Sequence, residues 1–126
     1  MQRFLNLTYK NQGRDYSGCD CYGLVYLFYR DFLNKEIPEF NLKYNSIRSQ
    51  CKNIEKCRHE FHKVTIPEKY DIILLKRANF RYHCGIYIKK NKMLHIAESM
   101  KSAITDMNDY KLCDKEYYRY GNWYFQ

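Results

Sequence analysis

Hydrophobic residues recur at helical spacing in one segment near the start of the chain. Five apolar positions there lie three or four residues apart, or side by side: Cys21, Leu24, Val25, Phe28 and Phe32. This spacing predicts an amphipathic helix over 21–33 with one buried face. Asp20 precedes it and is a favourable N-cap residue. We therefore expect Cys21 in the first turn, where backbone N–H groups and the helix dipole favour a thiolate.

Later segments have the patterns of strands. Residues 70–76 form an apolar run after a proline, which is typical of a central strand covered on both faces. Residues 83–88 and 93–97 are separated by a polar turn, which predicts a hairpin. The tail, 101–126, is expected to add one or two strands. One helix followed by antiparallel strands predicts an α+β domain.

The segment between the helix and the first of these strands is more polar. Residues 34–45 are expected to form a connection, and 46–62 a second, polar helix. This segment contains four residues of the types that bind zinc: Cys51, Cys57, His59 and His62. Their spacing matches no standard zinc finger, and on a helix the first and last would lie roughly 16 Å apart. An ordinary polar helix is the favoured interpretation, and no metal is expected.

Length and composition limit the class of protein. A chain of 126 residues, 45% of them hydrophobic, suits a single domain over 1–126. The formal net charge of +8 favours anionic partners such as a cell-wall polymer. Nucleic-acid binding is disfavoured because the Lys and Arg are scattered and accompany no binding motif. No run has the roughly eighteen apolar residues of a membrane helix, and the first residues lack a signal peptide's apolar core. We therefore expect synthesis in a cytoplasm and no membrane partner.

Cys21 and two histidines are of the residue types that form a cysteine nucleophile and its base. Such a nucleophile needs a base that makes the thiolate and a group that orients the base. His83 begins a predicted strand, and His95 lies twelve positions later on the next one. Because twelve is even, the two imidazoles share a face of the sheet if the hairpin loop is odd and lie on opposite faces if it is even. For any one of the three residues alone, a buried structural role is the commoner one.

Five short motifs follow one another along most of the chain: 9–15 (YKNQGRD), 19–25 (CDCYGLV), 70–74 (YDIIL), 83–88 (HCGIYI) and 94–97 (LHIA). Together they resemble the NlpC-type cysteine peptidases, papain-like enzymes that cut peptide bonds in the bacterial cell wall. The resemblance implies an α+β fold in which an N-terminal helix carrying the Cys packs on an antiparallel sheet. It is closest to members encoded by tailed phages, in which Gly-Arg-Asp precedes Asp-Cys-aromatic-Gly-Leu-Val.

The resemblance also implies a reaction. Cys21 is then the nucleophile, His83 the general base and His95 the residue that orients the base. The substrate is a stem peptide of peptidoglycan, cut between γ-D-glutamyl and a diamino acid as family members most often do. No metal or cofactor takes part.

Three further residues are implied to bind substrate. Tyr9 faces the thiol and lends its hydroxyl to the oxyanion, and Asp20 holds the substrate's amino group. The alternatives are a loop anchor for Tyr9 and a helix cap for Asp20. Tyr22 stands where most wall-cutting members have Ser, near the peptide, so the substrate preference is left open.

Other functions fit the same motifs. The chain is expected to act at the cell wall, either alone or as a virion tail component with phage tail proteins as partners. A catalytically inactive tail-tip protein of this fold is the main alternative, because fold does not guarantee function. A toxin injected into rival bacteria is a third.

Overall fold

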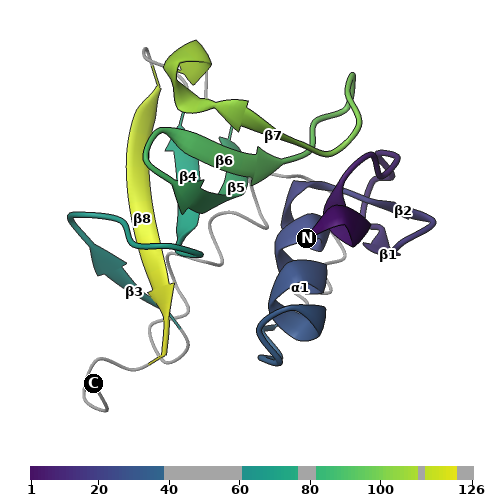
Figure 1. The fold of residues 1–126 in the computed structure, drawn as a ribbon, viewed down its shortest axis with the longest axis horizontal. Helices are drawn as coiled ribbons and strands as arrows, with labels where there is room; N and C mark the ends of the chain where they lie inside the picture. Colours follow the sequence, from purple (N-terminus) through teal and green to yellow (C-terminus); the bar gives the residue numbers. More distant parts are fainter. Residues whose placement is uncertain (39–60, 77–81, 111–112, 122–126) are drawn as a thin grey trace.

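The computed structural model describes residues 1–38, 61–76, 82–110 and 113–121 (Figure 1). The N-terminal part contains a short 3-10 helix η1 (Gln2–Phe4), strands β1 (Arg14–Asp15) and β2 (Gly18–Cys19), and helix α1 (Cys21–Asp31). The rest is built mostly of strands: β3 (Phe61–Val64), β4 (Ile72–Lys76), β5 (Tyr82–Lys89), β6 (Lys92–His95), β7 (Ala103–Asp106), the 3-10 helix η2 (Met107–Tyr110) and β8 (Asp114–Tyr120). This order confirms the α+β prediction. Among the described residues, no helix is long and apolar enough to cross a membrane.

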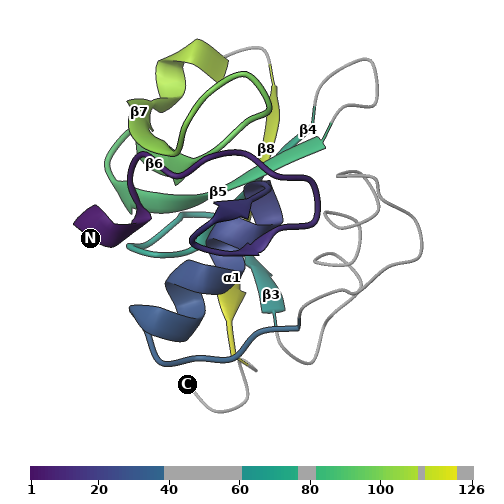
Figure 2. The same ribbon diagram turned by 90° about the vertical axis from the view of Figure 1, so that its right-hand side faces the viewer.

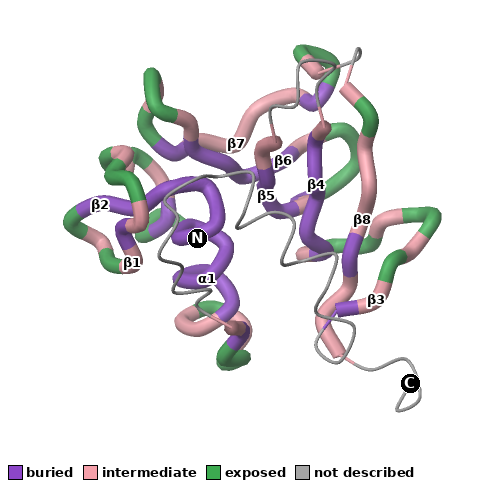
Figure 3. The backbone as a smooth tube through the Cα atoms, turned by 180° about the vertical axis from the view of Figure 1, so that it is seen from behind, coloured by how far each residue is buried: buried purple, intermediate pink, exposed green. Residues whose placement is uncertain are grey.

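Six strands form one antiparallel sheet in the order β3-β8-β4-β5-β6-β7. β4 is central, as predicted from its apolar run, and its residues alternate between two hydrophobic clusters. Ile72 and Leu74 belong to the larger cluster, which includes the buried hydrophobic residues of α1, whereas Ile73 and Leu75 belong to a smaller one with Met93. All four side chains are at most 1% exposed. Figure 3 shows the buried run along β4, whereas its neighbour β8 is mostly of intermediate burial.

Helix α1 forms a layer against the sheet, with β1 and β2 on its side away from β8 (Figures 1 and 2). It begins at Cys21, as predicted, because the Asp20 side chain accepts a hydrogen bond from the Gly23 N–H at 2.7 Å. Every residue from the start of α1 to Tyr29 is buried. The helix ends at Asp31, two residues earlier than expected.

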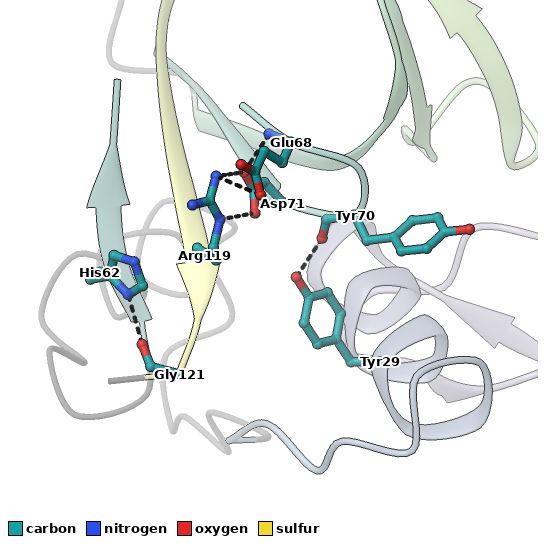
Figure 4. A network of polar contacts seen from close by, with 7 residues as sticks. All are labelled: Tyr29, His62, Glu68, Tyr70, Asp71, Arg119 and Gly121. Carbon is teal, nitrogen blue, oxygen red and sulfur yellow. Dashed lines mark hydrogen bonds and ion pairs between the residues drawn. The ribbon is translucent and has the colours of Figure 1, made fainter. Parts of the chain in front are cut away.

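Polar contacts hold the segment before β4 against the end of α1 and against β8 (Figure 4). The Tyr29 hydroxyl donates to the Tyr70 carbonyl oxygen at 2.5 Å, which ties α1 to the start of β4. Arg119 on β8 donates two hydrogen bonds, of 3.0 and 2.9 Å, to the buried carboxylate of Asp71, and it also pairs with Glu68. This paired charge fixes the segment before β4 against its neighbouring strand.

The predicted helix over 46–62 is wrong at its last two residues, and the rest of it lies outside the described residues. Phe61 and His62 begin β3, which pairs with β8 more than fifty residues later. A local pattern does not reveal a partner so distant in sequence. Of the four zinc-type residues, only His62 is described, and its Nδ1 lies 2.7 Å from the Gly121 carbonyl oxygen (Figure 4). Within the described ranges, no three His, Cys, Asp or Glu gather as a metal site would require.

Candidate functional site

A buried carboxylate holds the loop before α1 against the first turn of the helix. Asp20 is 0% exposed. Its Oδ1 accepts hydrogen bonds from the Gly23 N–H at 2.7 Å and from the Arg14 guanidinium at 2.9 Å, and its Oδ2 accepts one from the Gln12 N–H at 2.9 Å. The negative charge is thus paired with a cation and accepts three hydrogen bonds, which compensates for its burial. The position of Cys21, the next residue, depends on this network.

Two glycines allow the same loop to approach the helix closely. A Cβ on Gly23 would lie 2.1 Å from the Gly13 carbonyl oxygen, and a Cβ on Gly13 would lie 2.2 Å from the Gly18 carbonyl oxygen. Both distances are far below van der Waals contact, and both partners are backbone atoms. Glycine is therefore required at both positions by close packing of the backbone.

A register shift in the β5–β6 hairpin brings the two histidines to one face of the sheet. At the turn, Lys89 pairs with Lys92 across a two-residue loop, and this even loop would separate the two rings. The register shifts by one residue between Tyr87 and Lys89, and Ile86 then pairs with Leu94. One extra residue in the strand makes the loop effectively odd. His83 and His95 therefore project from the same face.

The two imidazoles form a hydrogen-bonded pair that continues to a third side chain. The distance from His83 Nε2 to His95 Nδ1 is 2.8 Å, and His95 Nε2 lies 2.7 Å from Thr105 Oγ1 on β7. The Tyr110 ring stacks on His83, with centroids 6.1 Å apart, and meets His95 edge-on at 5.7 Å. A Cβ on Gly85 would lie 3.2 Å from the His95 Cβ, so this glycine leaves room for the pair. Thr105 and Tyr110 were not predicted from the sequence to be site residues, because no local pattern relates η2 and β7 to the histidines.

Burial keeps His95 neutral. Its side chain is 1% exposed, and this burial, together with the charge of His83, lowers its pKa from 6.5 to about 4. The charge of Cys21 acts in the opposite direction and raises the pKa of His95, but its effect is smaller than that of burial. At neutral pH His95 therefore carries a single ring proton.

Tyr9 lies beside the start of α1. It forms an isolated parallel bridge with Cys19, and its side chain is half-buried. Burial raises the pKa of its hydroxyl above the ordinary value, and the nearby charge of Cys21 raises it further. Tyr9 thus keeps its proton at neutral pH and is available as a hydrogen-bond donor near the thiol.

The two remaining predicted site residues, Tyr22 and Asp20, have buried side chains. Tyr22 is 0% exposed, and its hydroxyl donates to the Pro38 carbonyl oxygen at 2.5 Å. Asp20 serves as the helix cap, which is the alternative role considered for it, and it also pairs with Arg14. For both residues, direct contact with substrate stays a prediction, whereas their structural contacts are present in the fold.

Lowering the pH should destabilise the protein through His95. In the unfolded chain this side chain binds a proton below about pH 6.5, whereas in the folded protein it does so only near pH 4. Between these values the unfolded state binds more protons, so the free energy of unfolding falls as the pH falls. The slope from one such group is at most about 1.4 kcal/mol per pH unit. Urea denaturation at pH 7, 6 and 5 measures this loss.

The variant His95→Asn isolates that contribution. The variant should lose the part of the pH dependence that arises between pH 6.5 and 4, while keeping the acid loss due to carboxylates with lowered pKa values, such as Asp31 and Glu116 at about 2. Equal slopes in the wild type and the variant over that range would show that His95 is not a buried neutral group.

Comparison with known proteins bears on this arrangement. The sequence model of the NlpC/P60 family matches residues 6–121 of the chain. The fold is similar to the crystal structure of the NlpC/p60 domain of the peptidoglycan hydrolase SagA, with a TM-score of 0.64 and 14% sequence identity, over 92% of this chain and 90% of that one. At this identity the likeness concerns the fold. A search of curated proteins found no match.

Proposed function

Because the chain belongs to the NlpC/P60 family, we propose that it is a cysteine peptidase that hydrolyses stem peptides of peptidoglycan. Cys21 is the nucleophile, His83 the general base and His95 the residue that orients it. The observation that carries the proposal is the 2.8 Å hydrogen bond between the two imidazoles, and the charge of Cys21 acts on the pKa of His95, one of the two. Nucleophile, base and orienting group are the three parts that such catalysis requires.

The proposed reaction is acyl transfer in two steps. The Cys21 thiolate attacks the carbonyl carbon of the stem-peptide bond, and the oxyanion that forms accepts hydrogen bonds from the Cys21 backbone N–H and the Tyr9 hydroxyl. The protonated His83 gives its proton to the leaving amine as the C–N bond breaks. His83 then takes a proton from a water molecule as the water oxygen attacks the thioester. The C–S bond breaks, the Cys21 thiolate leaves, and the new carboxylic acid gives its proton to solvent, which restores the thiolate beside a protonated His83.

Electrostatics favours Cys21 over its neighbour as the nucleophile. Burial raises the pKa of Cys19 to about 12, and the adjacent charge of Asp20 adds to the rise, so this thiol stays protonated at neutral pH. Cys21 instead occupies the first turn of α1, where the helix dipole stabilises a thiolate. Both thiols are free cysteines in the structure.

Family resemblance suggests the bond between γ-D-glutamyl and the diamino acid. The positive charge of the chain is complementary to an anionic wall. We propose that Asp20 and Tyr22 influence the substrate chiefly by shaping the loop and the helix start, since both side chains are buried. A place in a phage tail stays a prediction from sequence.

Digestion of purified peptidoglycan tests the proposal. Walls containing diaminopimelate and walls containing lysine are incubated with the protein, and the released fragments are identified by mass spectrometry, with Cys21→Ala as the control. New peptide ends that appear only with the wild type support the proposal, and their masses identify the bond. Absence of release from every wall type would favour the inactive tail component.

A further inference from the structure

We propose that Thr105 is a positioning residue, which holds His95 in the one tautomer that lets His83 act as a base. The inference rests on the proposed function for its catalytic meaning, but its structural content is independent. It assigns a role to β7, a strand that contains none of the residues predicted from sequence to form the site.

The contacts place Thr105 at the end of a chain of hydrogen-bonding groups. His95 Nδ1 faces His83 Nε2 at 2.8 Å, and His95 Nε2 faces Thr105 Oγ1 at 2.7 Å. Both nitrogens of the buried His95 ring are therefore engaged, one on each side. Because His95 is neutral, only one of them carries a proton, and the two hydrogen bonds must run in the same direction along the chain.

The reaction decides which direction is useful. When His83 is protonated on both nitrogens, its Nε2–H donates, so His95 Nδ1 must accept and the single His95 proton must lie on Nε2. That proton then needs an acceptor, and the Thr105 hydroxyl oxygen is within hydrogen-bonding distance. In the opposite tautomer, His95 would donate to His83 Nε2, and the remaining proton of a neutral His83 would occupy Nδ1. His83 would then have no free nitrogen to accept the proton of Cys21.

The sheet fixes the distance between Thr105 and His95. In the β6–β7 pairing, His95 lies opposite Ala103, and Thr105 lies opposite Met93. Thr105 is therefore the diagonal neighbour of His95 on the same face of two paired strands, a separation that side chains can bridge. The position of Thr105 is fixed by backbone pairing between two strands and not by a loop. A residue held in this way is suited to orient the His95 ring.

The test is the variant Thr105→Val, in which the hydroxyl is replaced by a methyl group with little change of shape. Long-range ¹H–¹⁵N NMR of the histidine rings reports which nitrogen carries the proton, and a His95→Asn sample assigns the signals. We expect wild-type His95 to be protonated on Nε2. In Thr105→Val this form should lose its dominance, since its proton has no acceptor. On wall fragments kcat/KM should fall about 10- to 100-fold, the order of loss expected from a misplaced catalytic group.

Two control variants accompany the test. Thr105→Ser keeps the hydroxyl and should restore both the tautomer and most of the activity. Thr65→Val changes an exposed threonine just after β3 and should alter neither. Wild-type kcat/KM and an unchanged tautomer in Thr105→Val would overturn the inference, and so would an activity loss without a tautomer change or one that serine does not restore.

The same measurements separate the two proposals. If the wild type cleaves no wall but the His95 tautomer still depends on the Thr105 hydroxyl, the proposed function fails and the positioning role stands. If the wild type cleaves peptidoglycan and the His95 tautomer is the same in Thr105→Val, the function stands and the positioning role fails. Thermal unfolding midpoints of all variants show whether each one folds.

Discussion

Cys21→Ala should lower kcat/KM on peptidoglycan by about 10³-fold or more, because the variant lacks the sulfur that forms the acyl-enzyme. The neighbouring Cys19 does not substitute for it, since burial raises its pKa to about 12. Fragment release, followed by mass spectrometry or by the appearance of free amino groups, measures the loss. The proteins should have similar unfolding midpoints, because the change removes a single sulfur atom.

Cys113→Ala is the matched control for this loss. Cys113 is also a free thiol but is only partly buried and packs beside the smaller hydrophobic cluster. Its substitution should leave kcat/KM near the wild-type value. If Cys21→Ala released fragments at the wild-type rate, the peptidase mechanism proposed here would be excluded. Equal losses in both variants would instead point to a general effect on the fold.

Asp20→Ala should lower the free energy of unfolding by about 3–5 kcal/mol, the range for removing one partner of a buried ion pair. The change leaves the Arg14 guanidinium, which is only 16% exposed, without its carboxylate. It also removes the acceptor for the Gln12 and Gly23 N–H groups. Because the whole domain is expected to be stable by only about 5–15 kcal/mol, this loss is a large fraction of the total. Urea denaturation at pH 7 measures it.

Two variants separate the causes of that loss. Asp20→Asn keeps an oxygen to cap the helix but removes the charge, so it should be less destabilising than Asp20→Ala. Asp15→Ala removes an exposed carboxylate that accepts hydrogen bonds from the N–H and hydroxyl of Ser17 in the same loop, so it should shift the denaturation midpoint much less than Asp20→Ala. A small effect of Asp20→Ala, comparable to that of Asp15→Ala, would show that the network does not hold the loop against α1.

Local patterns were sufficient where a residue's partners are close in sequence. The helix beginning at Cys21 followed from apolar spacing and from the capping preference of Asp20, and the structure has both. The central strand followed from an apolar run, since only a strand covered on both faces needs apolar residues at every position. These inferences require only periodicity and short-range geometry.

Distant pairing limited the remaining predictions. β3 begins inside a segment expected to be helical, because its partner β8 supplies the backbone hydrogen bonds from the other end of the chain. The polar character of Phe61–Val64 and its flanks gave no sign of that partner. The sequence likewise left open whether the two histidines lie on the same face of the sheet, because this depends on a shift of one residue in the β5–β6 pairing.

The sequence by itself therefore determined the α+β class, the family motifs and the residue types of a cysteine nucleophile with two histidines. Only the tertiary structure decided that a register shift between Tyr87 and Lys89 places His83 and His95 on one face, and that Thr105 meets His95 from the next strand. The physical reason is that strand register and sheet order are set by backbone hydrogen bonds between distant segments. One residue of slip reverses every side chain, and no local propensity encodes it.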